Sequence, residues 1–288
     1  MTLVVGYADG DIGFMVGDTL LSHEHFQLPD DVGPVNGEFH SLKVQVLSGT
    51  VAVAYAGKFQ EAYGAICEMK AALSENRDID PVEWIANREG LDGCEFLALL
   101  NGQTKQLFRI TDGKVLECRR AYIGLQSDYQ RYTELRQPYA GPPVRLDAGV
   151  EIAVTESEKE FDIVSNAMEA LSRDTVGKKA VTVGAISGCV IRVVDARISK
   201  QLEYMQAVEA SHFPWEPEGG FTLLASNTET RGVGIYFRSG RRGFIMPVCS
   251  EVPCIPSRAG DLDAFIAEGR DKFGMELVGG KWQTEPVA

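Results

Sequence analysis

Short apolar runs separated by turn residues open the chain. Leu3-Val4-Val5 and Phe14-Met15-Val16 are apolar, and Asp9-Gly10-Asp11 between them has the composition of a turn. This pattern predicts a β-hairpin over residues 1–18, with the first strand starting at residue 2. A strand so close to the N-terminus is unusual, because chain ends fray unless other elements hold them.

Along the following residues, the apolar positions switch between an alternating and a helical period. We predict strands where short apolar runs or alternating positions end in turn residues, and helices where apolar residues recur every three or four positions. The predicted strands cover 41–47, 51–56, 95–100, 106–110, 115–118, 121–123, 181–183 and 189–194. The predicted helices cover 58–76, 81–88, 127–136 and 157–173. Asp80 and Pro81 supply the cap and the first residue of the second helix.

The last ninety residues predict a helix near 198–210, strands at 221–225, 233–237 and 243–248, and a helix near 261–272. Strands grouped in hairpins, with helices in pairs between them, indicate an α+β fold in which helices cover antiparallel sheets. A doubly wound nucleotide-binding fold is not indicated, because no GxGxxG or GxxxxGK[ST] segment follows a strand.

Composition narrows the classes of partner. The formal net charge of −13 argues against nucleic acid and anionic membranes, since both are bound through basic surfaces. No apolar run approaches the roughly 20 residues of a membrane span, and the N-terminus lacks the pattern of a signal peptide. The six cysteines show no CxxC spacing and are expected to be reduced thiols, so we expect a cytoplasmic protein.

One triplet, His23-Glu24-His25, has the residue types of a metal site. In an extended segment the two histidines would point the same way, but no further ligand group lies nearby in the sequence. A solvated loop is therefore the preferred interpretation, and no metal or cofactor is predicted.

Four residues carry the candidate chemistry. Thr2 starts the first strand, Asp18 follows the hairpin, Lys43 lies on the next predicted strand, and Gly57 follows the apolar run 51–56. Sixteen positions separate Thr2 from Asp18, and fourteen separate Lys43 from Gly57. In this order and spacing the set resembles the N-terminal-nucleophile (Ntn) hydrolases of the proteasome β-subunit type, including their bacterial relatives. The resemblance covers residues 2–194, with a longer loop between Asp18 and Lys43.

The resemblance implies a four-layer αββα sandwich of two antiparallel sheets and a threonine-dependent hydrolase of peptide or amide bonds. The Thr2 hydroxyl would attack the carbonyl, and the α-amine of the same residue would accept the proton. Lys43 would lower the pKa of the threonine centre, and Asp18 would keep Lys43 charged and oriented. The Gly57 N–H would donate to the developing oxyanion. Each residue also has an ordinary structural interpretation, and it is their combined spacing that favours a site.

Two positions depart from the family pattern. Leu125 stands where a serine usually follows a glycine, and Gly184 stands where an acid usually precedes Ser187-Gly188. Ser127, Asp174 and Ser187 are the remaining supporting candidates. The departures leave open a structural or assembly protein that kept the fold without the activity, and the fold class also allows hydrolysis of a small-molecule amide.

The chemistry depends on removal of Met1, because the α-amine of Thr2 is otherwise an amide. Threonine is small enough at the second position for that removal. Family members commonly form rings, so the resemblance implies a homo-oligomer, possibly a ring. Residues 1–197 are expected to form the hydrolase domain, and residues 198–288 a C-terminal α/β extension packed on or beside it.

Overall fold

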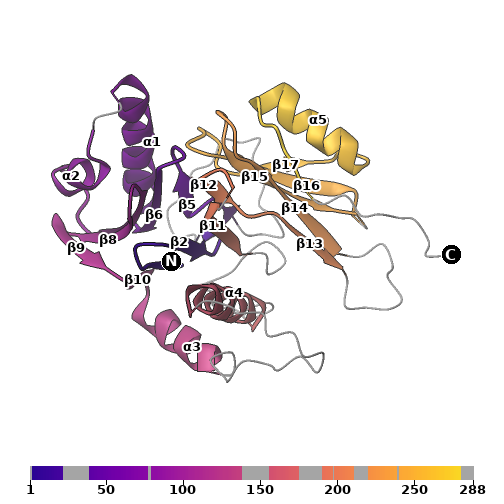
Figure 1. Ribbon diagram of the computed structural model, residues 1–288. Helices are drawn as coiled ribbons and strands as arrows, with labels where there is room; N and C mark the ends of the chain where they lie inside the picture. The colour runs from indigo at the N-terminus through magenta and orange to yellow at the C-terminus, as the bar shows by residue number, and fades with distance from the viewer. Residues whose placement is uncertain are drawn as a thin grey trace.

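The structure is a computed structural model, which describes residues 2–21, 39–76, 79–137, 156–174, 190–196, 198–210, 220–238 and 240–279. It contains both helices and antiparallel sheets, so the prediction of a mixed α+β fold is confirmed (Figure 1). Among the described residues, no helix is long and apolar enough to cross a membrane.

The first sheet contains the predicted N-terminal hairpin. Its five strands have the spatial order β10-β1-β2-β11-β12, and every neighbouring pair is antiparallel. They are β1 (Leu3–Ala8), β2 (Gly13–Gly17), β10 (Arg120–Gly124), β11 (Ile191–Ala196) and β12 (Gln201–Tyr204). β1 lies in the interior of the sheet, between β10 and β2. This pairing on both sides is what holds a strand so near the chain end.

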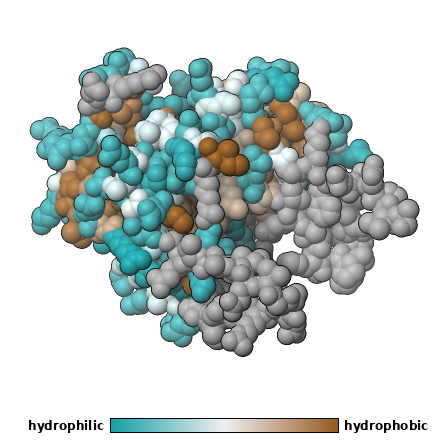
Figure 2. Space-filling model, in the orientation of Figure 1, coloured by the Kyte–Doolittle hydropathy of each residue, from teal (hydrophilic) through white to brown (hydrophobic). Residues whose placement is uncertain are grey.

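The second sheet is a meander of consecutive strands in the order β5-β6-β7-β8-β9. Its strands are β5 (Val44–Val46), β6 (Val51–Gly57), β7 (Cys94–Asn101), β8 (Lys105–Thr111) and β9 (Lys114–Cys118). β9 forms one edge, and its Val115 and Leu116 are exposed. On the face in Figure 2 the described surface is largely hydrophilic, with separate hydrophobic patches, one of them in the region of β9.

Two helices cover the outer face of the second sheet. They are α1 (Phe59–Glu75) and α2 (Pro81–Ala86), and their apolar side chains share a core with β6 and β7. The Asp80 side chain accepts hydrogen bonds from the N–H groups of Val82 and Glu83, which confirms the predicted cap.

Two further helices cover the outer face of the first sheet. They are α3 (Gln126–Arg136) and α4 (Glu156–Asp174), and they pack on β1 and β2 through a separate apolar cluster (Figure 1). Val5 and Phe14 point into this cluster, whereas Val4 and Met15 belong to the core between the two sheets. Alternate residues of the hairpin therefore face opposite sides, as the pleat of a strand requires.

The inner faces of the two sheets pack directly on each other. Gly6 of β1 allows this approach, because a Cβ there would come within 3.0 Å of the Leu107 side chain and 3.3 Å of Leu97. A larger residue would push the sheets apart, so this glycine is fixed by packing rather than by backbone conformation.

The last part of the chain forms a third sheet in the order β13-β14-β15-β16-β17. Its strands are β13 (Ala207–Ala210), β14 (Gly220–Ser226), β15 (Gly232–Phe237), β16 (Arg242–Pro247) and β17 (Ile255–Ser257), and α5 (Leu262–Phe273) covers one face. The other face, with Leu223 and Ile235, joins the core that contains Val4 and Val44. A two-stranded sheet of β3 (Leu20–Leu21) and β4 (Phe39–His40) completes the described strands.

The predicted helix near 198–210 is wrong. Strands β12 and β13 occupy these residues, and β12 extends the first sheet beyond residue 197. The period of the segment explains the error, because Leu202 and Tyr204 are buried while Gln201 and Glu203 are not. This alternation indicates a strand, but it covers only four residues and is easily missed when residues 198–210 are considered as one segment. The predicted strand at 181–183 lies outside the described residues.

Candidate active site

Thr2 immediately precedes β1 and lies in the interior of the molecule. Its side chain is 2% exposed, and Oγ1 has no hydrogen-bond partner among the described residues. The next residue is tied to the end of β2: Leu3 N donates to Asp18 Oδ1 at 3.2 Å, and Asp18 N donates to Leu3 O at 3.3 Å. Asp18 is therefore held beside the start of the chain.

Lys43 immediately precedes β5 and approaches the same place from the second sheet. A side-chain carbon at Gly17 would lie 3.6 Å from the Lys43 Cβ, so the end of β2 packs against this lysine. Both ionisable side chains are buried, with Asp18 0% and Lys43 4% exposed. Burial lowers the pKa of Lys43 to about 8, and the negative charge of Asp18 acts in the opposite direction. Thr2, Asp18 and Lys43 thus lie together at one end of the two sheets.

Aromatic and hydroxyl groups surround the Lys43 side chain. Its Nζ lies 5.6 Å from the centre of the Tyr55 ring, and the Tyr55 hydroxyl is hydrogen-bonded to Ser41 Oγ at 3.0 Å. Tyr55 N donates to Lys43 O at 3.2 Å. These contacts fix the lysine backbone and give its cationic head a favourable neighbour in a buried position.

His40 is a buried neighbour that the sequence interpretation left in a polar loop. Its Nδ1 is hydrogen-bonded to Thr19 Oγ1 at 2.9 Å, and its side chain is 3% exposed. Burial, and secondly the positive charge of Lys43, lower the His40 pKa to about 4. The imidazole is therefore neutral near pH 7.

Gly57 ends β6, directly before the first turn of α1. Its φ is +94°, and a Cβ would come within 2.2 Å of Gly93 O, so only glycine fits at this position. Gly57 pairs with Cys94 across the sheet, and the neighbouring pair is Ala56 and Glu95. The residue is exposed, in contrast to the buried group of Thr2, Asp18 and Lys43.

Glu95 and Gly124 connect this strand end to Thr2, and sequence reasoning missed both. Gly124 N donates to Glu95 Oε2 at 3.0 Å, and Arg109 donates to Glu95 Oε1 at 2.5 Å. Gly124 has a φ of +113°, and a Cβ there would come within 1.7 Å of Thr2 O. One available signal was the glycine directly before Leu125, and the other was an acid at the start of an apolar strand.

The supporting candidates lie elsewhere. Ser127 is exposed on the first turn of α3, so it does not belong to the buried group. Leu125 is the N-cap residue of α3 and makes no side-chain cap hydrogen bond, as expected for leucine in place of serine. Asp174 is the last residue of α4, and its side chain lies outside the described part of the structure, as do Ser187 and Gly184.

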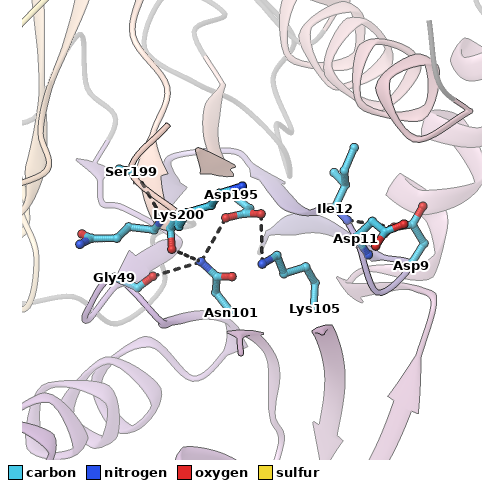
Figure 3. A network of polar contacts seen from close by, with 10 residues as sticks. Asp9, Asp11, Ile12, Gly49, Asn101, Lys105, Asp195, Ser199 and Lys200 are labelled. Atoms are coloured by element: carbon cyan, nitrogen blue, oxygen red, sulfur yellow. Dashed lines mark hydrogen bonds and ion pairs between the residues drawn. The ribbon is translucent and has the colours of Figure 1, made fainter. Parts of the chain in front are cut away.

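A second polar network lies at the opposite end of the sheets, where β1 and β7 terminate (Figure 3). Asn101 Nδ2 donates to Asp195 Oδ1 at 3.1 Å, to Lys200 O at 3.0 Å and to Gly49 O at 3.4 Å. Lys105 Nζ forms an ion pair with Asp195 Oδ2 at 3.3 Å. These groups satisfy one another and join turns from both sheets, so this network is structural.

The described residues include no group of three or more side chains that could hold a metal ion, and the His23-Glu24-His25 triplet lies outside them. Comparison of the chain with protein-family models and with characterised proteins gave no match.

Proposed function

We propose that the chain is an Ntn hydrolase of the proteasome β-subunit type, which cleaves a peptide or amide bond with Thr2 as the nucleophile. The observation that carries the proposal is the buried Thr2 hydroxyl, which lacks a hydrogen-bond partner among the described residues and lies beside buried Asp18 and Lys43. Thr111 and Thr222 also have buried hydroxyls without a partner among the described residues, so it is the neighbouring Asp18 and Lys43 that favour chemistry at Thr2.

The fold supports the same proposal. Helices α1 and α2 cover one sheet, helices α3 and α4 cover the other, and the two sheets pack face to face (Figure 1). We assign this arrangement to the four-layer αββα sandwich of the Ntn hydrolases. The third sheet and α5 are an addition to it.

In the proposed reaction, the free α-amine of Thr2 takes the proton from Oγ1 as that oxygen attacks the substrate carbonyl. The Lys43 ammonium, held near Asp18, stabilises negative charge that develops at Thr2. The Gly57 N–H, on the strand next to Glu95, donates to the oxyanion. The tetrahedral adduct then collapses: the C–N bond breaks, and the amine product leaves with the proton that the α-amine had taken. Water attacks the resulting ester on Thr2, the bond between the acyl carbon and Oγ1 breaks, Oγ1 regains a proton, and the acid product is released.

A second candidate is a structural or assembly protein without activity. Leu125 favours it, because a leucine caps α3 next to Gly124 and offers no hydroxyl to the threonine centre. The two candidates differ in whether Thr2 reacts.

The test uses three forms of the full chain: wild type, Thr2→Ser and Thr2→Ala. Alanine, serine and threonine are all small, so Met1 is removed equally and the variants are matched at their N-termini. We expect intact mass to show loss of Met1 and an electrophilic inhibitor to label wild type and Thr2→Ser but not Thr2→Ala. Hydrolysis of a peptide panel should follow the same order. Complete retention of Met1, or equal turnover by Thr2→Ala, would refute the proposal.

A further inference from the structure

The turn that follows β16 is fastened to helix α1 by two side chains of that helix. The Tyr63 hydroxyl donates to Ser250 O at 2.9 Å and accepts from Ser250 N at 2.9 Å. Lys70 Nζ donates to Val248 O at 3.0 Å. The third sheet is therefore held against α1 at residues 248–250, far from Thr2 in sequence and outside the candidate active site.

These contacts place two cysteines opposite each other. Cys67 lies four positions after Tyr63 and three before Lys70, so the three side chains share one face of α1. Cys249 lies between the two turn residues that Tyr63 and Lys70 bind. Cys249 N donates to Gln45 Oε1 at 3.1 Å, which fixes the turn from the other side.

Cys67 and Cys249 both pack against the apolar cluster that α1 shares with β6 and β7, and the two thiols influence each other's ionisation. Interaction with the Cys249 thiol, and secondly the positive charge of Lys70, lower the pKa of Cys67, while burial and the charge of Glu68 oppose the shift. Interaction with Cys67, together with burial, raises the pKa of Cys249. Both residues are free thiols and both are partly exposed, so a small oxidant can reach them.

We propose that Cys67 and Cys249 form a redox modification site, at which a hydroperoxide oxidises the pair to a disulfide joining α1 to the turn after β16. Cys67 is the thiolate that reacts first, and Cys249 is the thiol that resolves the product. The disulfide fixes the third sheet covalently to the helix that begins beside Gly57. This assignment does not depend on the reaction proposed for Thr2.

The steps balance for hydrogen peroxide as the oxidant. The Cys67 thiolate attacks one peroxide oxygen, the O–O bond breaks, and hydroxide leaves and is protonated to water, which gives a sulfenic acid. The Cys249 sulfur then attacks the Cys67 sulfur, the S–O bond breaks, and the departing hydroxide takes the Cys249 proton. Two thiols and one hydrogen peroxide thus yield one disulfide and two waters, and two electrons pass from sulfur to peroxide.

The experiment treats the reduced full-length chain with a small excess of hydrogen peroxide and maps the products without reduction. Trypsin leaves Cys67 in the peptide 59–70 and both Cys249 and Cys254 in the peptide 243–258, so the linked peptides must be fragmented to identify the partner. We expect a Cys67–Cys249 link that dithiothreitol removes. The oxidised protein should unfold at a midpoint higher by at least about 4 °C.

Serine variants separate the two roles. Cys249→Ser should accumulate a sulfenic acid on Cys67 that dimedone traps, whereas Cys67→Ser should show no trapped product on Cys249. Neither variant should gain thermal stability on oxidation. Cys118→Ser is the matched control, because Cys118 is partly exposed on β9 and bonds only to Leu116 O among the described residues, and it should behave as wild type. Oxidation of Cys118 without a Cys67–Cys249 link, or trapping on Cys249 instead of Cys67, would overturn the proposal.

Discussion

The backbone of Gly124 lies against the carbonyl oxygen of Thr2, close enough that a Cβ at residue 124 would come within 1.7 Å of that oxygen. Gly124 also has a φ of +113°, a backbone conformation that residues with a Cβ rarely adopt. The position of Thr2 therefore depends on a glycine at the end of β10. This strand lies on the opposite side of β1 from β2, the strand that leads to Asp18. The position of Thr2 also depends on the carboxylate that holds this glycine, because Glu95 accepts the Gly124 N–H.

Gly124→Ala should displace Thr2 and destabilise the fold. Steric overlap with the Thr2 carbonyl and the positive φ together should lower the free energy of unfolding by more than about 2 kcal/mol, as measured by urea denaturation. Gly64→Ala on α1 is the matched control, since no atom lies within 4 Å of a Cβ there. It should be neutral or stabilising by up to about 1 kcal/mol. Equal stability of the two variants would contradict this view of Gly124.

Glu95→Gln should reduce activity more than it reduces stability. The substitution weakens the charged hydrogen bonds to Gly124 N and Arg109 and loosens the support of Thr2, which we expect to lower kcat by about tenfold. The thermal midpoint should change little, because glutamine has the size of glutamate and its amide oxygen can still accept the Gly124 N–H. Glu117→Gln, on the exposed edge strand β9, is the control and should leave kcat unchanged. A kcat for Glu95→Gln that matches the control would rule out this positioning role.

The pH dependence of hydrolysis should show a falling limb near pH 8. Lys43 has a pKa of about 8, and its positive charge is lost as the pH rises through that value, so the stabilisation of negative charge that we propose for it at Thr2 would be lost as well. The kcat/KM profile of the wild-type chain measures this limb directly. Lys43→Met should be at least about a hundredfold less active and should lack the falling limb, whereas exposed Lys114→Met should keep the wild-type profile. A plateau that extends to pH 10 in the wild type would contradict the role of Lys43.

Stability should fall as the pH drops from 6.5 to 4 because His40 is buried in its neutral form. Its pKa is about 4 in the folded chain and near 6.5 in the unfolded chain, so the unfolded state binds more protons across this window. The neutral, buried His40 therefore adds about 3 kcal/mol to the free energy of unfolding above pH 6.5, and this contribution is lost as the pH falls towards 4. The free energy of unfolding, measured by urea denaturation at pH 7, 5 and 4, should decrease less steeply for His40→Gln than for the wild type. An identical dependence of the free energy of unfolding on pH in the wild type and the variant would refute this role of His40.

Most elements were predicted correctly where the sequence contains a residue with a strong local preference, such as a helix cap or a tight turn. Asp80 and Pro81 mark the start of α2, and Asn101 with Gly102 marks the turn between β7 and β8. The strand that carries Leu202 and Tyr204 was predicted as a helix, because its alternation of buried and more exposed residues covers only four positions.

The sequence likewise identified only some residues of the candidate site. Thr2, Asp18 and Lys43 could be chosen by their spacing, and the structure places them together. Gly124 and Glu95 could not, because their role arises from a contact between two sheets. The glycine before Leu125 and the acid at the start of an apolar strand could have drawn attention to these residues, but neither signal indicates that the two are in contact.

The hydroxyl of Tyr204 donates to Val44 O at 2.8 Å and accepts from Val46 N at 2.9 Å, and Leu223 of the third sheet shares the same core. A chain ended at residue 197 would lose strand β12 and would leave that core open to water. We therefore expect a single cooperative unfolding transition for the whole chain. A proteolytic fragment 1–197 should aggregate instead of folding on its own, so the C-terminal residues are required before any chemistry at Thr2 can be assayed.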